Sequence, residues 1–237
     1  MSNVVRPKGR KNLPKELLQF GRHLVYSEGT KTEPYYVENI KDSIASKYNC
    51  PSNEIEIISV NKEKTSYNTI GLFKYAEKDI KKRLQKKEHI DHVWVFFDKD
   101  DFPFEDFNIA HKTIQKMNNS KDLNLDGFKY NNKTGIAWHS CWSNEAFELW
   151  LCLYFHYIES SLSREQYKEH LNNIPSLKKI GFNYEKKLSG IHKLLQENGG
   201  VMKNAIKHAK KLEELNGIQN PSTGVYQFAE YFQLYME

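Results

Sequence analysis

Two acidic segments of the chain could act together in chemistry. Glu28 follows the run at residues 23–26, and Asp98 follows the five apolar residues 93–97. Both runs are typical of buried β-strands, so the two acids should emerge at strand carboxyl ends, where open α/β sheets place their active sites. Carboxylates gathered at such an edge repel one another unless a cation lies among them, and hard divalent metals prefer oxygen ligands. The pattern therefore predicts a metal-dependent enzyme.

The second acidic segment has the spacing of a chelating pair. Side chains two residues apart on an extended strand point to the same side, so Asp98 and Asp100 can reach one cation while Lys99 points away. Asp98 would also be partly desolvated behind the apolar run, which is unfavourable without a partner. Asp100 and Asp101 have an ordinary alternative as loop or turn residues. We predict Asp98 and Asp100 as metal ligands, with Asp101 as a further candidate.

The first acidic segment is a weaker signal when taken alone. Gly29 permits a tight turn beside Glu28 that leaves room for a phosphate or a metal ion. Glu28 could otherwise be a turn acid, and Glu33 an acid that the helix dipole favours at a helix start. Lys31 could steady a phosphate, because a nearby cation stabilises the negative charge that spreads in a transition state. The second segment favours a catalytic role for Glu28, with Glu33 and Lys31 as additional catalytic candidates.

A third acidic pair lies near the middle of the chain. Glu145 and Glu148 are three residues apart and would share one face of a helix expected over residues 146–155. Ser143 or Asn144 can cap that helix, and acids in its first turn also compensate the helix dipole. The sequence leaves both roles open for the pair, and Glu148 is the stronger candidate for a catalytic role.

The elements that position these residues alternate between strands and helices in the first part of the chain. We expect strands at residues 23–26, 54–60, 93–97 and 135–138, and helices at residues 33–48, 68–87 and 104–117. Repeated strand–helix units predict a parallel sheet with right-handed crossovers. After residue 144 we expect only helices, at residues 146–155, 163–171, 184–197, 201–215 and 223–235. Ser222 and Thr223 would cap the last helix, and His156 would close a hydrogen bond at a helix end.

Length and composition are those of a globular protein. The chain has 237 residues, of which 39% are hydrophobic, and we divide it into a basic arm at 1–17, an α/β core at 18–142 and a helical C-terminal portion at 143–237 packed on the core. No run approaches the roughly 18 apolar residues of a membrane helix, and no apolar signal region follows the basic N-terminus. The three cysteines lack CxxC spacing, as reduced cytosolic thiols do. We therefore expect a cytoplasmic protein with no membrane partner.

Positive charge is concentrated in two places, although the net charge is only +5. One is the N-terminal arm between Arg6 and Lys15, and the other is the helical segment between Lys78 and Lys87. Such patches can follow phosphates and make binding sensitive to salt. For each patch alone we prefer the simpler interpretation, which is a disordered leader and a solvated helix face.

The order of the motifs resembles two related groups of proteins. A strand followed by Glu28-Gly29, and another followed by Asp98-x-Asp100, resemble the Toprim arrangement of topoisomerases, primases and overcoming-lysogenization-type nucleases. A fuller set, which spans nearly the whole chain after the N-terminal arm, resembles the RloB-like family. Its motifs are Glu28-Gly29-x-x-Thr32-Glu33-Pro34-x-Tyr36, Phe97-Asp98-x-Asp100-Asp101-Phe102, Ser143-Asn144-Glu145-x-Phe147-Glu148-Leu149-Trp150 and Asn220-Pro221-Ser222-Thr223.

The resemblance implies a Toprim-like, mostly parallel sheet flanked by helices, with a helical C-terminal part. It also implies a nuclease site that uses one or two Mg²⁺ or Mn²⁺ ions. By motif position, Glu28 matches the glutamate that acts as general acid/base or as an additional metal ligand, and Asp98 and Asp100 match the metal-binding pair. Proteins of this kind are often encoded beside an ABC- or AAA-type ATPase in bacterial antiphage and abortive-infection systems. Some related effectors look like RNases that attack tRNA, and others cut DNA.

We therefore predict hydrolysis of phosphodiester bonds in RNA, such as tRNA, or in DNA, by an antiphage effector with an ATPase partner. The sequence is also compatible with a homo-oligomer. The main alternative is a non-catalytic Toprim-like subunit that docks an ATPase or binds nucleic acid. Transesterification through a tyrosine is less favoured, because it usually requires a much larger apparatus for handling strands than this chain could contain.

Overall fold

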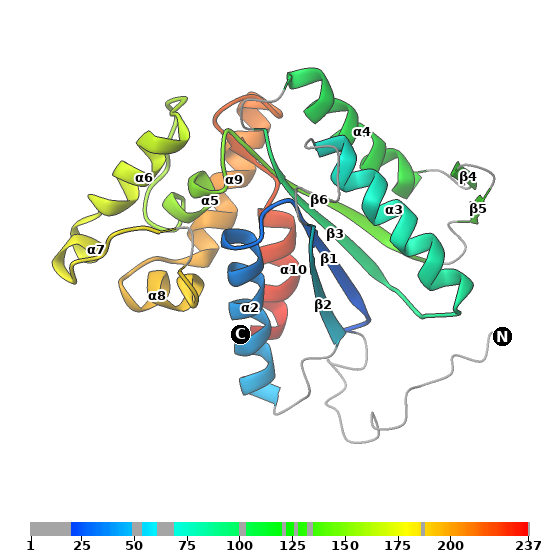
Figure 1. The fold of residues 1–237 in the computed structure, drawn as a ribbon. Coiled ribbons are helices and arrows are strands. Elements are labelled where there is room, and N and C mark those ends of the chain that lie inside the picture. The colour runs from blue at the N-terminus through cyan, green and yellow to red at the C-terminus, as the bar shows by residue number, and fades with distance from the viewer. Residues whose placement is uncertain are drawn as a thin grey trace.

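The structure is a computed structural model that describes residues 20–48, 54–60, 69–99, 103–119, 122–125, 128–131, 135–185 and 188–236. At its centre lies a five-stranded sheet with the strand order β2-β1-β3-β6-β7 (Figure 1). Four of these strands are parallel: β1 (His23–Ser27), β2 (Ile55–Ser59), β3 (His92–Asp98) and β6 (Ala137–Asn144). The short β7 (Ser222–Thr223) pairs antiparallel with β6 and closes one edge.

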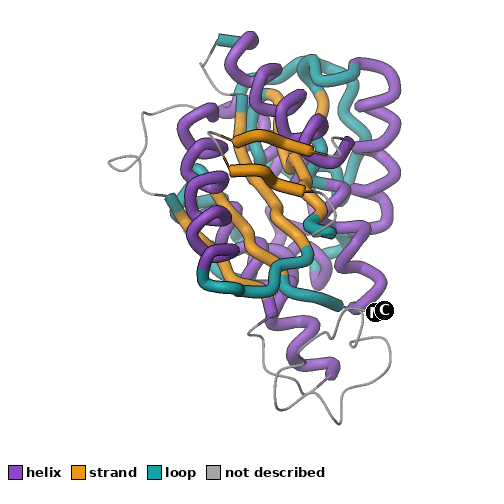
Figure 2. Tube along the Cα trace, turned by 90° about the vertical axis from the view of Figure 1, so that its right-hand side faces the viewer, coloured by secondary structure: helices purple, strands orange, loops and turns teal. Residues whose placement is uncertain are grey.

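Helices cover both faces of this sheet, as Figures 1 and 2 show. α2 (Thr32–Tyr48) and α10 (Tyr226–Met236) pack on one face, whereas α3 (Thr69–Gln85) and α4 (Phe104–Asn119) pack on the other. Successive strand residues alternate between the two faces, as the period of a β-strand requires. Val25, Trp94 and Phe96 join the cluster with α2 and α10, and Leu24, Val93 and Val95 join the cluster with α3 and α4.

The strand order changes direction between β1 and β3. From β1 the chain passes through α2 to β2 on one side, whereas from β3 it passes through α4 to β6 on the other side. Because α2 and α4 lie on opposite faces of the sheet, the chain leaves β1 and β3 in different directions. Such a switch point leaves a crevice outside the strand carboxyl ends, where ligands bind in open α/β folds. The ends of β1 and β3 are therefore the expected place for a site.

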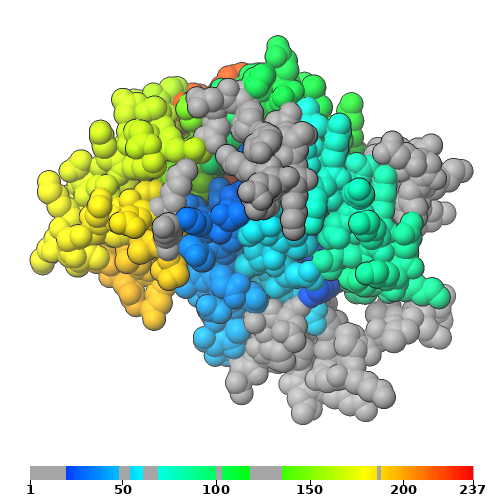
Figure 3. All heavy atoms as spheres, viewed as in Figure 1, coloured from blue at the N-terminus to red at the C-terminus, as the bar shows by residue number. Residues whose placement is uncertain are grey.

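The C-terminal helices pack on the α2 and α10 side of the sheet. They are α5 (Glu148–Cys152), α6 (Arg164–Asn172), α7 (Pro175–Lys179), α8 (Ile191–Glu197) and α9 (Met202–Asn216). In the space-filling view, the yellow-green to orange part of the surface comes from this region and lies beside the blue start of the described chain (Figure 3).

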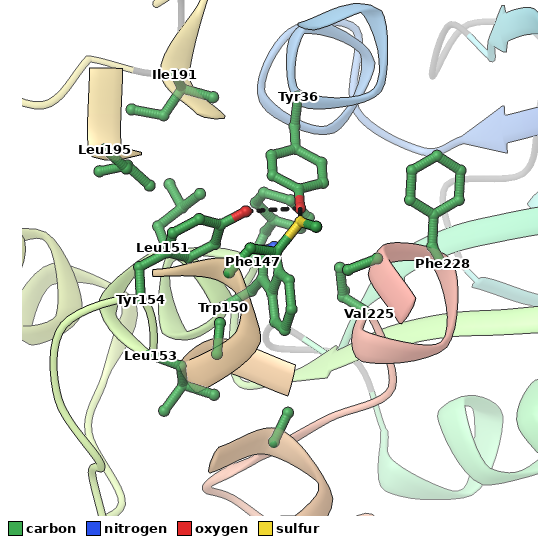
Figure 4. Close-up of a cluster of buried hydrophobic side chains, with 14 of the residues drawn as sticks. Tyr36, Phe147, Trp150, Leu151, Leu153, Tyr154, Ile191, Leu195, Val225 and Phe228 are labelled. Atoms are coloured by element: carbon green, nitrogen blue, oxygen red, sulfur yellow. Dashed lines mark hydrogen bonds between the residues drawn. The ribbon is translucent and has the colours of Figure 1, made fainter. Parts of the chain in front are cut away.

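One hydrophobic cluster joins these helices to the sheet (Figure 4). Trp150 and Tyr154 pack against Tyr36 from α2, with ring centroids 6.3 Å apart for Tyr36 and Trp150. The Tyr36 and Tyr154 hydroxyls are 2.9 Å apart, and the Tyr154 hydroxyl lies 2.8 Å from Nδ1 of His192. The helical C-terminal portion therefore shares its core with the sheet, and β6 runs across residue 142, where we placed the boundary between the two parts.

Most elements predicted for the first part of the chain are confirmed. The strands expected at 23–26, 54–60 and 93–97 are β1, β2 and β3, and the helices expected at 33–48, 68–87 and 104–117 are α2, α3 and α4. The mostly parallel sheet, its flanking helices and the helical C-terminal part form the predicted Toprim-like α/β fold.

The prediction of a capped helix at residue 146 was wrong. β6 continues to Asn144 and α5 begins only at Glu148, so neither Ser143 nor Asn144 caps it. Instead, Ser143 Oγ lies 3.1 Å from Thr223 Oγ1, and Asn144 Nδ2 donates to the Ile218 carbonyl at 2.8 Å. The sequence around these polar residues resembles a helix cap. Their true partners give no local signal, because Thr223 is 80 residues from Ser143 and Ile218 is 74 residues from Asn144.

The chain also departs from prediction in elements with weak local signals. β4 (Asp122–Leu125) and β5 (Phe128–Asn131) form an antiparallel pair between residues 117 and 135, where no strand was predicted, and α7 was not predicted either. β7 stands where a helix was expected to start, and α10 begins at Tyr226. α8 begins at Ile191 and not at residue 184, because Gly190 adopts a left-handed conformation with φ of 76°.

Of the two basic patches expected from the sequence, the structure describes only the one on α3. The N-terminal arm at residues 1–17 lies outside the described residues. On α3, Arg83 forms ion pairs with Glu56, Asp79 and Glu88 at 2.6, 2.8 and 3.1 Å, so part of that patch is neutralised within the fold. None of the described helices is long and apolar enough to cross a membrane.

Candidate active site

A cavity of about 250 Å³ opens at the carboxyl ends of β1 and β3. It lies at the switch point of the sheet, next to the start of α2. Ten described residues line it: Glu28, Gly29, Thr30, Lys31, Thr32, Glu33, Asp98, Phe147, Glu148 and Arg164. The loop after β1 supplies four of these residues and the start of α2 supplies two, and β3, the start of α5 and the start of α6 supply the rest.

Backbone hydrogen bonds hold the loop after β1 in place. The N–H of Glu28 donates to the Phe96 carbonyl at 3.2 Å, which extends the β1–β3 pairing by one residue. Ser27 Oγ donates to the Gly29 carbonyl at 2.9 Å, and the Ser27 carbonyl accepts from the Val60 N–H at 3.0 Å. Glu28 is therefore fixed at the sheet edge beside β3, as its position after a strand predicted.

Gly29 is needed because a side chain there would collide with Glu33. An added Cβ would meet the Glu33 carboxylate well inside van der Waals contact. Glu33 is the second residue of α2 and 9% exposed, so a side chain at residue 29 would require the Glu33 carboxylate to leave its present position. The Glu28-Gly29-x-x-x-Glu33 spacing thus brings a second carboxylate against the turn that carries the first.

Asp98 and Glu148 are buried acids that face a common cation. Asp98 is the last residue of β3, and Glu148 is the first residue of α5. Arg164 Nη2 lies 2.9 Å from Asp98 Oδ2, and Arg164 Nε lies 3.7 Å from Glu148 Oε2. The contact of Arg164 with Asp98 is a charge-assisted hydrogen bond. The contact with Glu148 is an ion pair whose distance is too long for a hydrogen bond. Sequence reasoning missed Arg164, because it lies 66 residues after Asp98 in a helix that carries no motif.

The cavity is negative overall. Its lining includes four carboxylates and the two basic side chains of Lys31 and Arg164, a formal charge of −2 for the described residues. Tyr184 reflects this charge: burial raises the pKa of its hydroxyl above the ordinary value, and the Glu148 carboxylate raises that pKa further. The hydroxyl therefore stays protonated and donates to Thr32 Oγ1 at 3.5 Å.

The donor chemistry of the cavity fits a hard divalent cation. Glu28, Glu33, Asp98 and Glu148 offer only carboxylate oxygens, the ligands that Mg²⁺ and Mn²⁺ prefer. Across the part of the chain that the structure describes, no three His, Cys, Asp or Glu side chains are close enough to form a metal site. Asp100 and Asp101 lie outside the described residues, so their role as metal ligands stays a prediction.

Other predicted candidates lie away from the cavity lining. Glu145 is not among the lining residues, and His156 is exposed, with its ring 5.8 Å from that of His170. Ser222 and Thr223 are fully buried in β7. Thr223 Oγ1 accepts from the Val225 N–H at 3.3 Å, one residue before α10, so it keeps a local role close to the predicted cap.

Comparison with known proteins agrees with the motifs. A family model described as RloB-like protein matches residues 23–231, which include β1, the whole cavity lining and β7. No curated protein matches the chain, and no solved structure matches it. The family match covers most of the 237 residues. The chain therefore belongs to the RloB-like protein family.

Proposed function

We propose that this protein is a cytoplasmic nuclease that hydrolyses phosphodiester bonds with Mg²⁺ or Mn²⁺. The observation that carries the proposal is the grouping of Glu28, Glu33, Asp98 and Glu148 around one cavity at the switch point of the sheet. Such a group of carboxylates repels itself unless cations are bound, and it lies where this class of fold binds ligands. The substrate is RNA, such as tRNA, or DNA.

The proposed mechanism assigns a task to each lining side chain. Asp98, Glu28 and the predicted ligand Asp100 would hold one or two metal ions, and Asp101, Glu33 and Glu148 are further carboxylates for the site. A bound divalent ion supplies polarisation of the phosphoryl oxygen and an acidified water. In the alternative role that the family resemblance implies, Glu28 would accept the proton of the attacking water. Lys31 borders the same cavity and would stabilise negative charge that develops on the phosphoryl group.

The proposed biological role follows from the family. RloB-like proteins resemble effectors of bacterial antiphage systems, in which a partner ATPase senses infection. We extend that role to this chain and include in the proposal an ATPase partner and a homo-oligomer. An effector of this kind must be inactive until it is triggered, because its substrate is present in the same cell.

A second candidate function is a non-catalytic subunit that docks the ATPase or binds nucleic acid. The observation in its favour is the ion pair of Arg164 with Asp98, which neutralises a predicted metal ligand at 2.9 Å. In that case the acids would serve the local structure, and no substrate would be cleaved.

Cleavage assays distinguish the two functions. Purified protein, with and without any ATPase encoded by an adjacent gene, is incubated with tRNA, single-stranded RNA and plasmid DNA in Mg²⁺ or Mn²⁺. We expect cleavage of at least one substrate, lost in Glu28→Gln and kept in Glu197→Gln, a matched change at an exposed acid of α8. Full activity of Glu28→Gln would refute the site, and no cleavage under any condition would favour the docking subunit.

A further inference from the structure

Arg164 is the first residue of α6, a position where a helix gains nothing from a cation. A capping box fixes this helix end: Ser163 Oγ accepts from the Gln166 N–H at 3.4 Å, and Gln166 Oε1 accepts from the Ser163 N–H at 2.8 Å. The helix dipole favours anions at a helix N-terminus and disfavours cations. The position of Arg164 is therefore explained by what its side chain contacts and not by helix formation.

The guanidinium of Arg164 contacts buried acids and also borders the cavity. The side chains of Asp98 and Glu148 are 11% and 2% exposed, whereas that of Arg164 is 23% exposed. Arg164 lines the cavity together with Glu28 and Lys31. Its charge is thus within reach of any ligand in the cavity without a movement of the backbone of α6.

Arg164 and a divalent metal ion would use the same carboxylate. Two cations on one carboxylate repel each other, so a metal ion at Asp98 weakens the contact of Arg164 with that acid. An arginine keeps its charge at any physiological pH, and its forked N–H donors match the oxygens of a phosphate. A guanidinium displaced from Asp98 therefore has a natural second partner in the phosphate of a nucleic acid.

The geometry points to Arg164 as the phosphate-binding residue of this site, held on Asp98 until a metal ion takes that carboxylate. The inference rests on the proposed nuclease function and adds to it the residue that recognises the phosphodiester. Metal binding and substrate binding are then coupled through one side chain. The phosphodiester is common to RNA and DNA, so both polymers are tested.

Manganese binding in the absence of nucleic acid tests the exchange directly. Isothermal titration calorimetry with Mn²⁺ compares the wild type with Arg164→Gln and Arg164→Lys. We expect Arg164→Gln to bind Mn²⁺ about three- to tenfold more tightly, because a competing cation is gone, and Arg164→Lys to stay near the wild type. Unchanged or weaker Mn²⁺ binding by folded Arg164→Gln, as judged by circular dichroism, would overturn the exchange. If Arg164→Gln does not fold, the role of Arg164 is tested by the affinity of Arg164→Lys for nucleic acid, in the binding assay described next.

Binding of nucleic acid tests the phosphate contact. A labelled single-stranded RNA and a labelled duplex DNA of the same sequence are titrated in Ca²⁺, which replaces the ion expected to support cleavage. Both Arg164 variants should bind the preferred polymer about tenfold or more weakly, since lysine lacks the fork. Lys168→Gln is the matched control on the same helix, because Lys168 pairs with Glu165 and does not line the cavity.

The outcomes separate the two proposals. Wild-type affinity in both Arg164 variants, or no binding of either polymer by the wild type, would overturn the phosphate-binding role. Failure of the wild type to cleave any substrate would count against the nuclease function alone, since the Mn²⁺ affinity of Arg164→Gln is measured without cleavage. A lower melting temperature with unchanged Mn²⁺ and polymer affinity would show that the ion pair is only structural.

Discussion

The two ends of the central sheet carry ionisable side chains in opposite settings. At the carboxyl ends of β1 and β3, Glu28 and Asp98 border a cavity of about 250 Å³ that is negative overall. At the amino ends of the same strands, His23 and His92 stack with ring centroids 4.7 Å apart, and His23 is fully buried. One end gathers charge around open space, and the other buries neutral rings in an aromatic stack.

The histidine end satisfies its polar groups without any charge. His23 Nε2 donates to the Phe20 carbonyl at 2.6 Å, and its Nδ1 accepts from the Trp94 indole N–H at 3.1 Å. Both ring nitrogens are therefore used in the neutral form. His139 stacks on Trp94 with centroids 3.7 Å apart, and burial is the main cause that lowers the pKa of His23 and His139 to about 3.

The comparison teaches where this fold departs from the usual rules of burial. Buried polar groups are normally paired and neutral, as they are at the histidine end. The carboxyl end keeps four acids around a cavity that only two basic side chains share, and the proposed metal site rests on this arrangement. Variants at the carboxyl end should therefore mainly lower activity, and variants at the amino end should mainly lower stability.

The largest expected effect is on catalysis at the carboxyl end. Asp98→Asn keeps the shape of the side chain but removes the charge that would hold a metal ion, so cleavage should fall by about 100-fold or more. His139→Gln, at the amino end, should leave the cleavage rate within about twofold. Initial rates on the preferred substrate measure both. Equal losses of cleavage rate in Asp98→Asn and His139→Gln would contradict the proposed difference between the two ends of the sheet.

The largest expected effect on stability is at the amino end. His23→Ala leaves the Trp94 N–H without its present partner and opens a small cavity, while the Phe20 carbonyl keeps its hydrogen bond from the Tyr231 hydroxyl. The free energy of unfolding should fall by about 3 kcal/mol. Urea denaturation measures the change. His156→Ala, at an exposed histidine, is the control and should change the same quantity by less than about 0.5 kcal/mol. Similar losses in both variants would contradict the account of the histidine stack.

The histidine stack should also make stability depend on pH. The pKa of His23 and of His139 is lowered from 6.5 to about 3, so below pH 6.5 the unfolded chain binds protons that the folded chain does not. Unfolding free energy should therefore fall as the pH drops from 6.5 towards 4, by up to about 1.4 kcal/mol per pH unit for each such histidine. Denaturation curves at several pH values measure the slope. A slope that stays the same in His139→Gln would contradict this assignment.

The smallest expected effect concerns the turn after β1. Gly29→Ala places a methyl group against the Glu33 carboxylate, so the free energy of unfolding should fall by about 1–3 kcal/mol. Adding Glu33→Ala removes the collision and should recover most of that loss, which a double-mutant cycle measures. Strictly additive effects of the two changes would show that the Gly29–Glu33 contact is not the reason for the glycine.

Residues whose role depends on a local pattern could be predicted from the sequence. The apolar run before Asp98 and the run before Glu28 identified β3 and β1, and acids directly after such runs must lie at the sheet edge. The parallel sheet followed from the repeated strand–helix units. β1 and β3 are neighbours in the sheet, so their carboxyl ends lie together. Lys31, in the loop after β1, and Glu33, at the start of α2, are close to this place because they follow Glu28 within five residues.

Contacts between distant segments could not be predicted in the same way. Arg164 reaches Asp98 across 66 residues, and Ser143 reaches Thr223 across 80 residues. Nothing near either residue in sequence signals its partner, because the spatial contact depends on how α6 and β7 pack on the sheet. The histidine stack has the same origin, since His23, His92 and His139 come from three strands.

The central claim is that the acids at the carboxyl ends of β1 and β3 bind the metal ion used in cleavage. Anomalous diffraction at the manganese edge, from crystals soaked in Mn²⁺ at a concentration that supports cleavage, tests it most directly. We predict an anomalous peak in the cavity within coordination distance of Glu28 and Asp98 oxygens, and its loss in crystals of Asp98→Asn. A cavity without a peak, or a peak bound only by residues elsewhere, would contradict the claim.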